Sequence, residues 1–353
     1  MSLQISLVVP ERRLDVTVDV PRGSTLAVLG PNGAGKSTIL HAVAGLLRPH
    51  DARIALGGRV LSEVVDGHAR TWVPAHRRRV SLLAQQADLF PHLTVRDNVA
   101  FGPRSRGSGR TQAGEIAEEW LDRVGLEALG QRRPSQLSGG QAQRVAVARA
   151  LAAAPDLVLL DEPFAALDVD ATPALRHVLG EVLAERTAVI VTHDVLDAVL
   201  LADAVAVVEE GRVVEHGPTH EVLSRPRSRF GARIAGLNLV AGTWDGSGVR
   251  TRDGRRLQGT LREAGVGDGA PVVALFRPAA VAVHLDTVPG SPRNVVEVTV
   301  STLEPHGDLV RVRGDDLHAD ITPAAVAELR LAPGMRAQFV VKAAEVEIHP
   351  ATT

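Results

Sequence analysis

The stretch Gly30-Pro31-Asn32-Gly33-Ala34-Gly35-Lys36-Ser37-Thr38 decides the fold of this chain. Its first eight residues fit the pattern G-x-x-x-x-G-K-S. An apolar run, Thr25 to Leu29, precedes the loop, and residues 38–47 have helical character. A strand, a glycine-rich loop and a helix in this order direct backbone N–H groups and the positive end of a helix dipole at one point. The sequence therefore predicts that this loop binds the phosphate groups of a nucleotide.

Two side chains of this loop have the chemistry that nucleotide phosphates require. Lys36 can reach the β- and γ-phosphates, and the hydroxyl of Ser37 can ligate Mg²⁺. We take the whole loop, residues 30–38, as the candidate nucleotide site, with ATP and Mg²⁺ as the expected ligands.

Outward from the loop, residues 4–224 alternate short apolar strands with glycine turns and helical stretches. Leu157 to Leu160 and Ala188 to Val191 are continuous apolar runs. Strands that are apolar on both faces are typical of a buried, mostly parallel sheet in an α/β domain.

The run from Leu157 ends in two carboxylates, Asp161 and Glu162. A carboxylate at this place can hold Mg²⁺ through water, and a second one can act as general base on an attacking water molecule. An Asp-Glu pair alone is weak evidence, but its position downstream of the phosphate-binding loop favours Asp161 as metal ligand and Glu162 as catalytic base.

A third motif, Leu137-Ser138-Gly139-Gly140-Gln141, precedes a predicted helix that Pro155 ends. Small residues at a helix N-terminus form another anion site. The motif resembles the signature of ABC transporter ATPases. In that family the residues corresponding to Ser138, Gly139, Gly140 and Gln141 close over ATP held by a second subunit. The resemblance therefore implies a homodimer that encloses two ATP molecules.

The same resemblance identifies further elements in the expected order. Gln85 matches the glutamine that contacts Mg²⁺ or the attacking water, and His193 matches the histidine that touches the γ-phosphate. Ala166-Leu167-Asp168 matches a loop at the dimer interface. The predicted catalytic set is therefore Glu162, His193 and Gln85. The family stacks adenine on an aromatic residue, but this chain has no Tyr and residues 7–19 have no aromatic side chain. Arg12 and Arg13 are the alternatives for that contact.

After residue 228 helical periodicity weakens, and short Val-rich runs separated by Gly, Asp and Pro follow. This pattern predicts a small β-barrel or sandwich. The expected fold class is an α/β P-loop ABC ATPase domain with a helical subdomain, followed by a β-rich, OB-like C-terminal domain. We expect an ATPase domain at 1–228, a β-rich connecting region at 229–290 and the C-terminal domain at 291–353.

Composition excludes several classes of protein and of binding partner. The 353 residues include no Cys, which excludes a disulfide scaffold, and the net charge of -2 gives no overall attraction to nucleic acid. No apolar run is long enough to span a bilayer, and no secretory signal is visible. Resemblance to importer ATPases, through residues 88–95 and the separate β-rich extension, implies two integral membrane permease subunits and an extracytoplasmic substrate-binding protein. It also implies a peripheral location on the cytoplasmic face of the membrane.

The C-terminal segment resembles the small Mop (TOBE-type) domain of molybdate importer ATPases. In that family a tetrahedral oxyanion is held by backbone N–H groups and by polar or basic side chains. The candidates here are Ser291, Arg293, Asn294 and Lys342. The resemblance implies molybdate as cargo, with tungstate indistinguishable. Three alternatives stay open: the same ATPase serving sulfate, iron(III) or polyamine import, a module that stores or senses oxyanions, and a barrel that serves only dimerisation.

Overall fold

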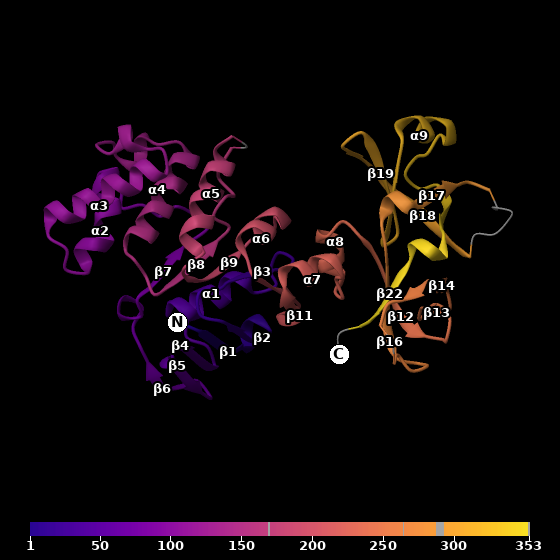
Figure 1. Ribbon diagram of the computed structural model, residues 1–353, viewed down its shortest axis with the longest axis horizontal. Coiled ribbons are helices and arrows are strands. Elements are labelled where there is room, and N and C mark those ends of the chain that lie inside the picture. The colour runs from indigo at the N-terminus through magenta and orange to yellow at the C-terminus, as the bar shows by residue number, and fades with distance from the viewer. Residues whose placement is uncertain (169, 264, 287–292, 352–353) are drawn as a thin grey trace. The chain divides into compact units, whose positions relative to one another are not determined.

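The computed structural model describes residues 1–168, 170–263, 265–286 and 293–351 (Figure 1). The chain divides into two compact units, Met1–His220 and Glu221–Thr353. Helices and parallel strands lie in the first unit, and the second is mostly β-structure. The predicted fold class is thus confirmed. None of the helices in the described residues is long and apolar enough to cross a membrane.

A mostly parallel sheet forms the centre of the first unit, in the strand order β11-β10-β3-β9-β8-β7. Every residue of β3, β8 and β9 is buried, because helices α1 and α6 pack on this sheet. The elements are β3 (Thr25–Leu29), α1 (Lys36–Ala44), β7 (Val80–Leu83), β8 (Leu157–Asp161), α5 (Ala171–Leu183), β9 (Thr187–Val191), α6 (Val195–Leu201), β10 (Ala204–Glu209) and β11 (Arg212–Pro218).

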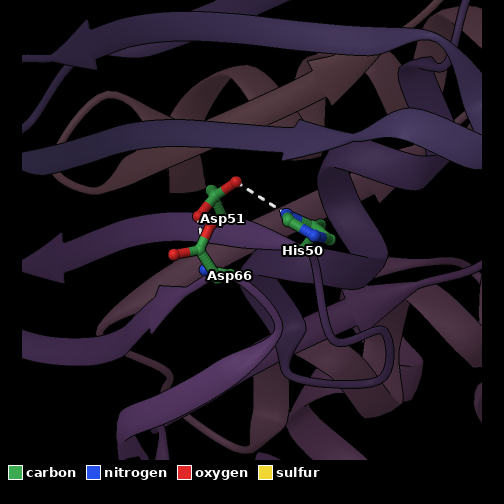
Figure 2. Close-up of side chains that lie close together, drawn as sticks. All are labelled: His50, Asp51 and Asp66. Atoms are coloured by element: carbon green, nitrogen blue, oxygen red, sulfur yellow. Dashed lines mark hydrogen bonds and ion pairs between the residues drawn. The ribbon is translucent and has the colours of Figure 1, made fainter.

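An antiparallel sheet of order β2-β1-β4-β5-β6 shares a hydrophobic core with α1 and the parallel sheet. Burial alternates along β1 and β2, so one face of this sheet packs on the core and the other is solvated. The strands are β1 (Leu3–Val9), β2 (Leu14–Val20), β4 (Asp51–Leu56), β5 (Arg59–Val65) and β6 (His68–Trp72). Where β4 begins, His50 and Asp51 lie beside Asp66 of the β5–β6 turn (Figure 2).

Helices α2 (Val95–Ser105), α3 (Arg110–Arg123) and α4 (Gly139–Ala152) pack against one another and form the predicted helical subdomain. Thr94 caps α2 by accepting a hydrogen bond from the backbone N–H of Asp97. Ser138 caps α4 in the same way through the N–H of Gln141.

The second unit contains two sheets, with strand orders β14-β13-β12-β16-β22-β15 and β17-β21-β18-β19-β20. Their apolar faces share one core, in which Phe276, Phe339 and Ile348 are buried. The elements are α7 (Thr219–Ser224), α8 (Arg229–Ile234), β12 (Asn238–Trp244), β13 (Gly248–Arg250), β14 (Arg256–Gln258), β15 (Thr260–Leu261), β16 (Pro271–Phe276), β17 (Val281–His284), β18 (Asn294–His306), β19 (Leu309–Gly314), β20 (Leu317–Ile321), α9 (Pro323–Leu329), β21 (Arg336–Val341) and β22 (Glu347–Pro350).

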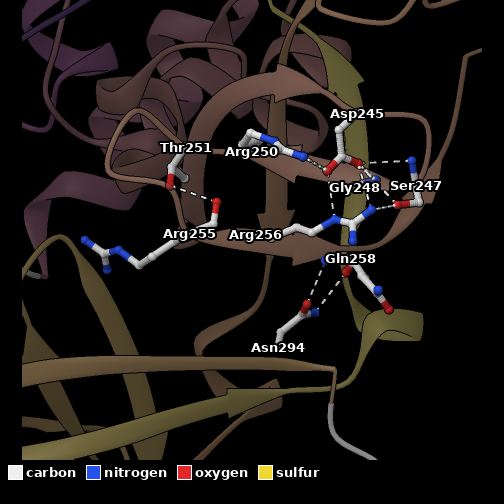
Figure 3. Close-up of polar contacts among 9 residues, drawn as sticks. All are labelled: Asp245, Ser247, Gly248, Arg250, Thr251, Arg255, Arg256, Gln258 and Asn294. Carbon is white, nitrogen blue, oxygen red and sulfur yellow. Dashed lines mark hydrogen bonds and ion pairs between the residues drawn. The ribbon is translucent and has the colours of Figure 1, made fainter.

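Asp245 organises the hairpin between β12 and β13 (Figure 3). Its carboxylate accepts from the backbone N–H groups of Ser247 and Gly248, and it pairs with Arg250 and Arg256. Burial raises the pKa of Asp245, but the hydrogen bonds from Arg256 and Ser247 outweigh it and lower that pKa to about 2. This network stabilises the turn, so we assign it a structural role.

His349 on β22 is 1% exposed, and neither ring nitrogen has a hydrogen-bond partner among the described residues. Its Nδ1 lies 3.9 Å from Oε1 of Glu263, and its Nε2 lies 3.6 Å from Oε2 of Glu347. Burial lowers the pKa of His349, and the two carboxylates oppose that shift. Because an imidazole buried in its neutral form must be charged in acid, this residue links the stability of the second unit to pH.

We expect the second unit to lose stability as pH falls below about 6.5, the pKa of an unperturbed histidine. Just below that pH the imidazole of His349 is protonated in the unfolded state. It is still neutral in the folded state, because burial lowers its pKa. His349→Leu should weaken this dependence. The part that remains should come from His318, whose pKa is also lowered by burial. Thermal unfolding between pH 8 and pH 5 measures the dependence, through the fluorescence of Trp244 in a chain whose other two tryptophans are replaced by Phe. An unchanged profile in His349→Leu would contradict this assignment.

Candidate functional site

Glycines shape the phosphate-binding loop between β3 and α1. Gly33 and Gly35 have φ of 81° and 98°, in the left-handed region that side chains rarely adopt. A Cβ atom on Gly30 would lie 2.2 Å from the carbonyl oxygen of Val208. Pro31, Asn32 and Ala34 complete the turn, and Gly35 is the N-cap of α1. The loop therefore holds its backbone in a shape that leaves N–H groups at the N-terminus of α1.

Lys36 is the first residue of α1 and is 7% exposed. Its ammonium donates to the carbonyl oxygens of Gly30 at 2.8 Å and Pro31 at 2.9 Å. Burial lowers the pKa of Lys36, and the nearby carboxylates of Glu162 and Asp161 oppose that shift. A desolvated ammonium is thus fixed inside the loop, close to two acidic groups.

Asp161 ends β8 and is 6% exposed. Burial raises its pKa, while a hydrogen bond from Ser37 lowers it. A side-chain hydroxyl and a carboxylate that already touch provide the hard oxygen donors that Mg²⁺ prefers. These two residues therefore fit a magnesium ion.

Glu162 follows in a left-handed backbone conformation, with φ of 47°. Such a conformation is uncommon for a residue with a side chain, and it concentrates at functional sites. A hydrogen bond of 2.9 Å from its N–H to the carbonyl of Val191 holds this conformation. The side chain of Glu162 is 18% exposed.

The other two predicted catalytic side chains meet at this carboxylate. Nδ1 of His193 lies 3.4 Å from Oε1 of Glu162, and Nε2 of Gln85 lies 3.5 Å from Oε2. Glu162, His193 and Gln85 follow β8, β9 and β7, which are neighbouring parallel strands whose carboxyl ends meet at one edge of the sheet. Sequence-distant residues thereby form one cluster beside the phosphate-binding loop.

Ser138 and Gln141 form a reciprocal capping box at the start of α4. The N–H of Gln141 donates to Oγ of Ser138 at 3.2 Å, and the N–H of Ser138 donates to Oε1 of Gln141 at 3.0 Å. Ser138 and Gly139 are exposed and Gly140 is half-buried. Within the described part of the chain, no hydrogen bond or ion pair joins these residues to the phosphate-binding loop. The signature motif is thus exposed at the start of α4.

Several supporting contacts were not predicted from sequence. Arg12 donates to the hydroxyl of Thr38 at 2.6 Å, which places a guanidinium beside the first turn of α1. Arg176 donates to the buried Asp197 at 2.9 Å, and Asp197 accepts from Thr192 at 2.7 Å, directly before His193. No local signal reveals these pairs, because they join residues from different elements.

The predicted oxyanion residues of the second unit separate into three groups. Arg293 and Lys342 line one pocket of about 690 Å³, together with Arg277, which sequence analysis missed. Asn294 is fully buried, and its amide exchanges hydrogen bonds of 2.6 and 2.9 Å with the backbone of Gln258 (Figure 3). Its side chain thus joins β18 to β14, and this corrects its predicted use as an anion ligand. Ser291 lies outside the described residues.

The fold and this site define an ATP-binding cassette, and the chain belongs to the family of ATP-binding subunits of ABC transporters. Residues 14–165 match the ABC transporter family and residues 290–348 match the TOBE domain. A molybdenum import ATP-binding protein, ModC, of Mycobacterium tuberculosis (strain ATCC 25618 / H37Rv) is 52% identical over 99% of this chain and 97% of that protein.

Other relatives are less similar. A molybdate/tungstate import ATP-binding protein, WtpC, of Pyrococcus horikoshii is 34% identical over 95% of each chain. An Fe(3+) ions import ATP-binding protein, FbpC, of Pseudomonas fluorescens is 37% identical over 86% of this chain and 88% of that protein. Among solved structures, a dimeric post-hydrolysis state of the ATP-binding cassette MJ0796 bound to ADP and Pi has a TM-score of 0.54 and 28% identity. It covers 62% of this chain and 98% of that chain. ATP binding by this chain and its membership of an ABC transporter follow from these findings.

Proposed function

We propose that this chain hydrolyses ATP to energise the import of molybdate or tungstate. The observation that carries the proposal is the 52% identity to a molybdenum import ATP-binding protein, which extends over 99% of this chain and so includes the β-rich second unit. The iron(III) import relatives support the alternative cargo less well, because the similarity to them is lower and covers less of this chain.

ATPase stimulation in the assembled transporter tests the cargo. The chain is reconstituted with its permease subunits in vesicles, and the binding protein is loaded with molybdate, tungstate, sulfate or iron(III). We expect molybdate or tungstate to stimulate hydrolysis well above the unloaded binding protein. Stimulation by sulfate or iron(III) alone would replace the proposed cargo, while the ATPase assignment would remain.

The residues of the cluster have distinct roles in this proposal. Lys36 orients the β- and γ-phosphates, and Glu162 accepts a proton from the attacking water. His193 and Gln85 orient the water and the γ-phosphate from either side of Glu162. Ser37 and Asp161 would hold Mg²⁺, which supplies neutralising positive charge at the phosphates.

A homodimer completes each ATP site. The partner subunit's Ser138 and the two glycines after it would supply the second anion-binding surface, with the free N–H groups of a helix N-terminus. The outward-facing capping box of α4 supports this arrangement. The dimeric state described for the similar cassette MJ0796 supports it as well.

Two permease subunits would dock beside α2. Asn98 is buried and fixes the preceding loop through hydrogen bonds with the backbone of Phe90 at 2.8 and 3.2 Å. Phe90 packs on Phe101, with ring centroids 4.7 Å apart, and Phe101 remains 47% exposed. An exposed aromatic side chain on α2, packed on a loop that is fixed by hydrogen bonds, suits a helix from a membrane subunit. This docking would place the chain on the cytoplasmic face of the membrane, with the substrate-binding protein on the other side.

The pocket lined by Arg277, Arg293 and Lys342 is the proposed oxyanion site of the second unit. Its three cationic side chains outnumber the one carboxylate that lines it, Glu345, and so suit a dianion, because charge-assisted hydrogen bonds are the strong ones. We also keep as a proposal the division into 1–228, 229–290 and 291–353, which would make the last segment the oxyanion-binding or dimerisation domain.

Equilibrium dialysis of the full chain with molybdate tests this pocket. Arg293→Ala and Lys342→Ala are each expected to weaken binding about 10- to 100-fold, since a hydrogen bond to a charged group contributes about 1.5–3 kcal/mol. Arg336→Ala, an exposed arginine of β21, is the matched control and should bind normally. If the wild-type chain binds no molybdate, both oxyanion storage and oxyanion feedback are excluded, and the transport role is unaffected.

A further inference from the structure

A cluster of metal-ligating side chains lies outside the nucleotide site, at one corner of the antiparallel sheet (Figure 2). One ligand atom each from His50, Asp51 and Asp66 lie within 4.8 Å of one another. Nδ1 of His50 is 2.7 Å from Oδ2 of Asp51. The side chains of His50 and Asp51 are 44% and 42% exposed, so a small cation can reach them from solvent.

Backbone hydrogen bonds fix all three residues. The N–H of His50 donates to the carbonyl of Val8 at 3.1 Å, and the N–H of Gly67 donates to the carbonyl of His50 at 2.7 Å. Asp66 has φ of 49°, and its N–H donates to Oδ1 of Asp51 at 2.8 Å. The ligand atoms are therefore carried by a strand and a tight turn that are already joined. These residues lose little conformational freedom when a ligand binds.

The charge at this corner favours a cation. The imidazole of His50 lies beside the carboxylates of Asp51 and Asp66, and Glu11 is near enough for its charge to act on this imidazole. Thus three carboxylates act on one imidazole. Arg48, the nearby cationic side chain, donates to the carbonyl of Gly67 at 3.2 Å. A divalent cation would neutralise this concentration of negative charge.

We propose that His50, Asp51 and Asp66 bind a divalent transition-metal ion of the zinc and cobalt class. An imidazole nitrogen with carboxylate oxygens suits Zn²⁺, Co²⁺ and Ni²⁺, whereas Mg²⁺ prefers oxygen ligands only. Three protein ligands leave room for water on the metal. The bound ion would connect the start of β4 to the β5–β6 turn. The proposal rests on these residues alone and does not depend on the cargo or on ATP hydrolysis.

Co²⁺ is the probe, titrated into the untagged full chain and followed by its visible absorption. We expect His50→Ala and Asp66→Asn each to weaken Co²⁺ binding by about 10- to 100-fold or more. Substitution of residues that only support a metal's ligands already lowers metal affinity by about 10- to 100-fold. His68→Ala is the matched control, because its Nδ1 contacts the backbone carbonyl of Asp66 at 2.8 Å and lies outside the cluster. His193→Ala is the second control, since the exposed His193 beside Glu162 is another possible chelator. Both controls should bind as the wild type does.

Three results would overturn the proposal: no Co²⁺ binding to the wild type, undiminished binding by His50→Ala, or loss of binding only in His193→Ala. Competition adds a further test, because Zn²⁺ should displace Co²⁺ and excess Mg²⁺ should not. Thermal unfolding shows whether each variant is folded. Without metal, His50→Ala should unfold near the wild-type temperature. Added Zn²⁺ should raise the unfolding temperature of the wild type and of both controls, and should leave that of His50→Ala unchanged.

Discussion

Replacing Glu162 by Gln is expected to slow ATP hydrolysis by about 10²–10⁴-fold while ATP binding persists. The amide keeps the size of the side chain but cannot accept a proton from water. It also keeps the left-handed backbone at φ of 47° and the bond from its N–H to Val191, so the local structure should not change. With hydrolysis blocked, two ATP molecules should hold the proposed dimer closed.

Steady-state phosphate release measures the slowed step, and gel filtration with ATP measures the trapped dimer. Glu185→Gln, on an exposed glutamate after α5, is the control and should hydrolyse ATP and release the dimer normally. If Glu162→Gln turned over within about twofold of the wild type, another group would have to be the base. His193, whose Nδ1 lies 3.4 Å from this carboxylate, would then be examined first.

The nucleotide loop was predictable because its determinants are local. A strand, three glycines and a helix N-terminus occupy residues 25–44 without interruption, and the structure places β3 and α1 there. Gln85 and His193 were identified through the resemblance to the ABC transporter ATPases. The structure gives the physical reason why they meet Glu162, since each of the three follows one of three neighbouring parallel strands whose carboxyl ends lie at one edge of the sheet.

Contacts across the sheets were beyond sequence analysis. Asn294 was predicted to bind an oxyanion. Its side-chain amide instead forms hydrogen bonds with the backbone of Gln258, 36 residues away. Arg277 lines the same pocket as Arg293 and Lys342 because β17 and β18 both pair with β21, a register that no motif encodes. Likewise, only the pairing of β4 with β5 brings His50 near Asp66.

The residue that contacts adenine was also not settled by the sequence. The absence of an aromatic residue from residues 7–19 left Arg12 and Arg13 as equal alternatives. The structure distinguishes them, because Arg12 contacts Thr38 at the start of α1, whereas Arg13 adopts a left-handed conformation with φ of 50° beside Gly211. Arg12 is thus the arginine that contacts the nucleotide loop. We expect the phosphate contacts to supply most of the affinity for ATP.

Replacing Lys36 by Ala is therefore expected to weaken ATP binding about 100-fold or more. Two charge-assisted hydrogen bonds from the ammonium to phosphate oxygens would contribute about 1.5–3 kcal/mol each, and 1.4 kcal/mol is a factor of ten. The loss has a second cause in this chain. Lys36 lies close enough to Asp161 and Glu162 for their charges to affect its pKa, so its removal leaves two carboxylates facing the incoming phosphates.

Binding of a fluorescent ATP analogue measures the affinity of Lys36→Ala, and thermal unfolding without nucleotide separates that loss from misfolding. The separation matters because Lys36 also bonds the carbonyls of Gly30 and Pro31, at 2.8 and 2.9 Å, and so supports the loop itself. Lys36→Arg keeps the charge in a larger, planar group that these carbonyls do not fit, and should bind with intermediate affinity. Lys342→Ala, in the second unit, should bind ATP normally. Retained affinity in a folded Lys36→Ala protein would refute the assignment of this loop to the phosphates, since its one desolvated cation would then contribute nothing to their binding.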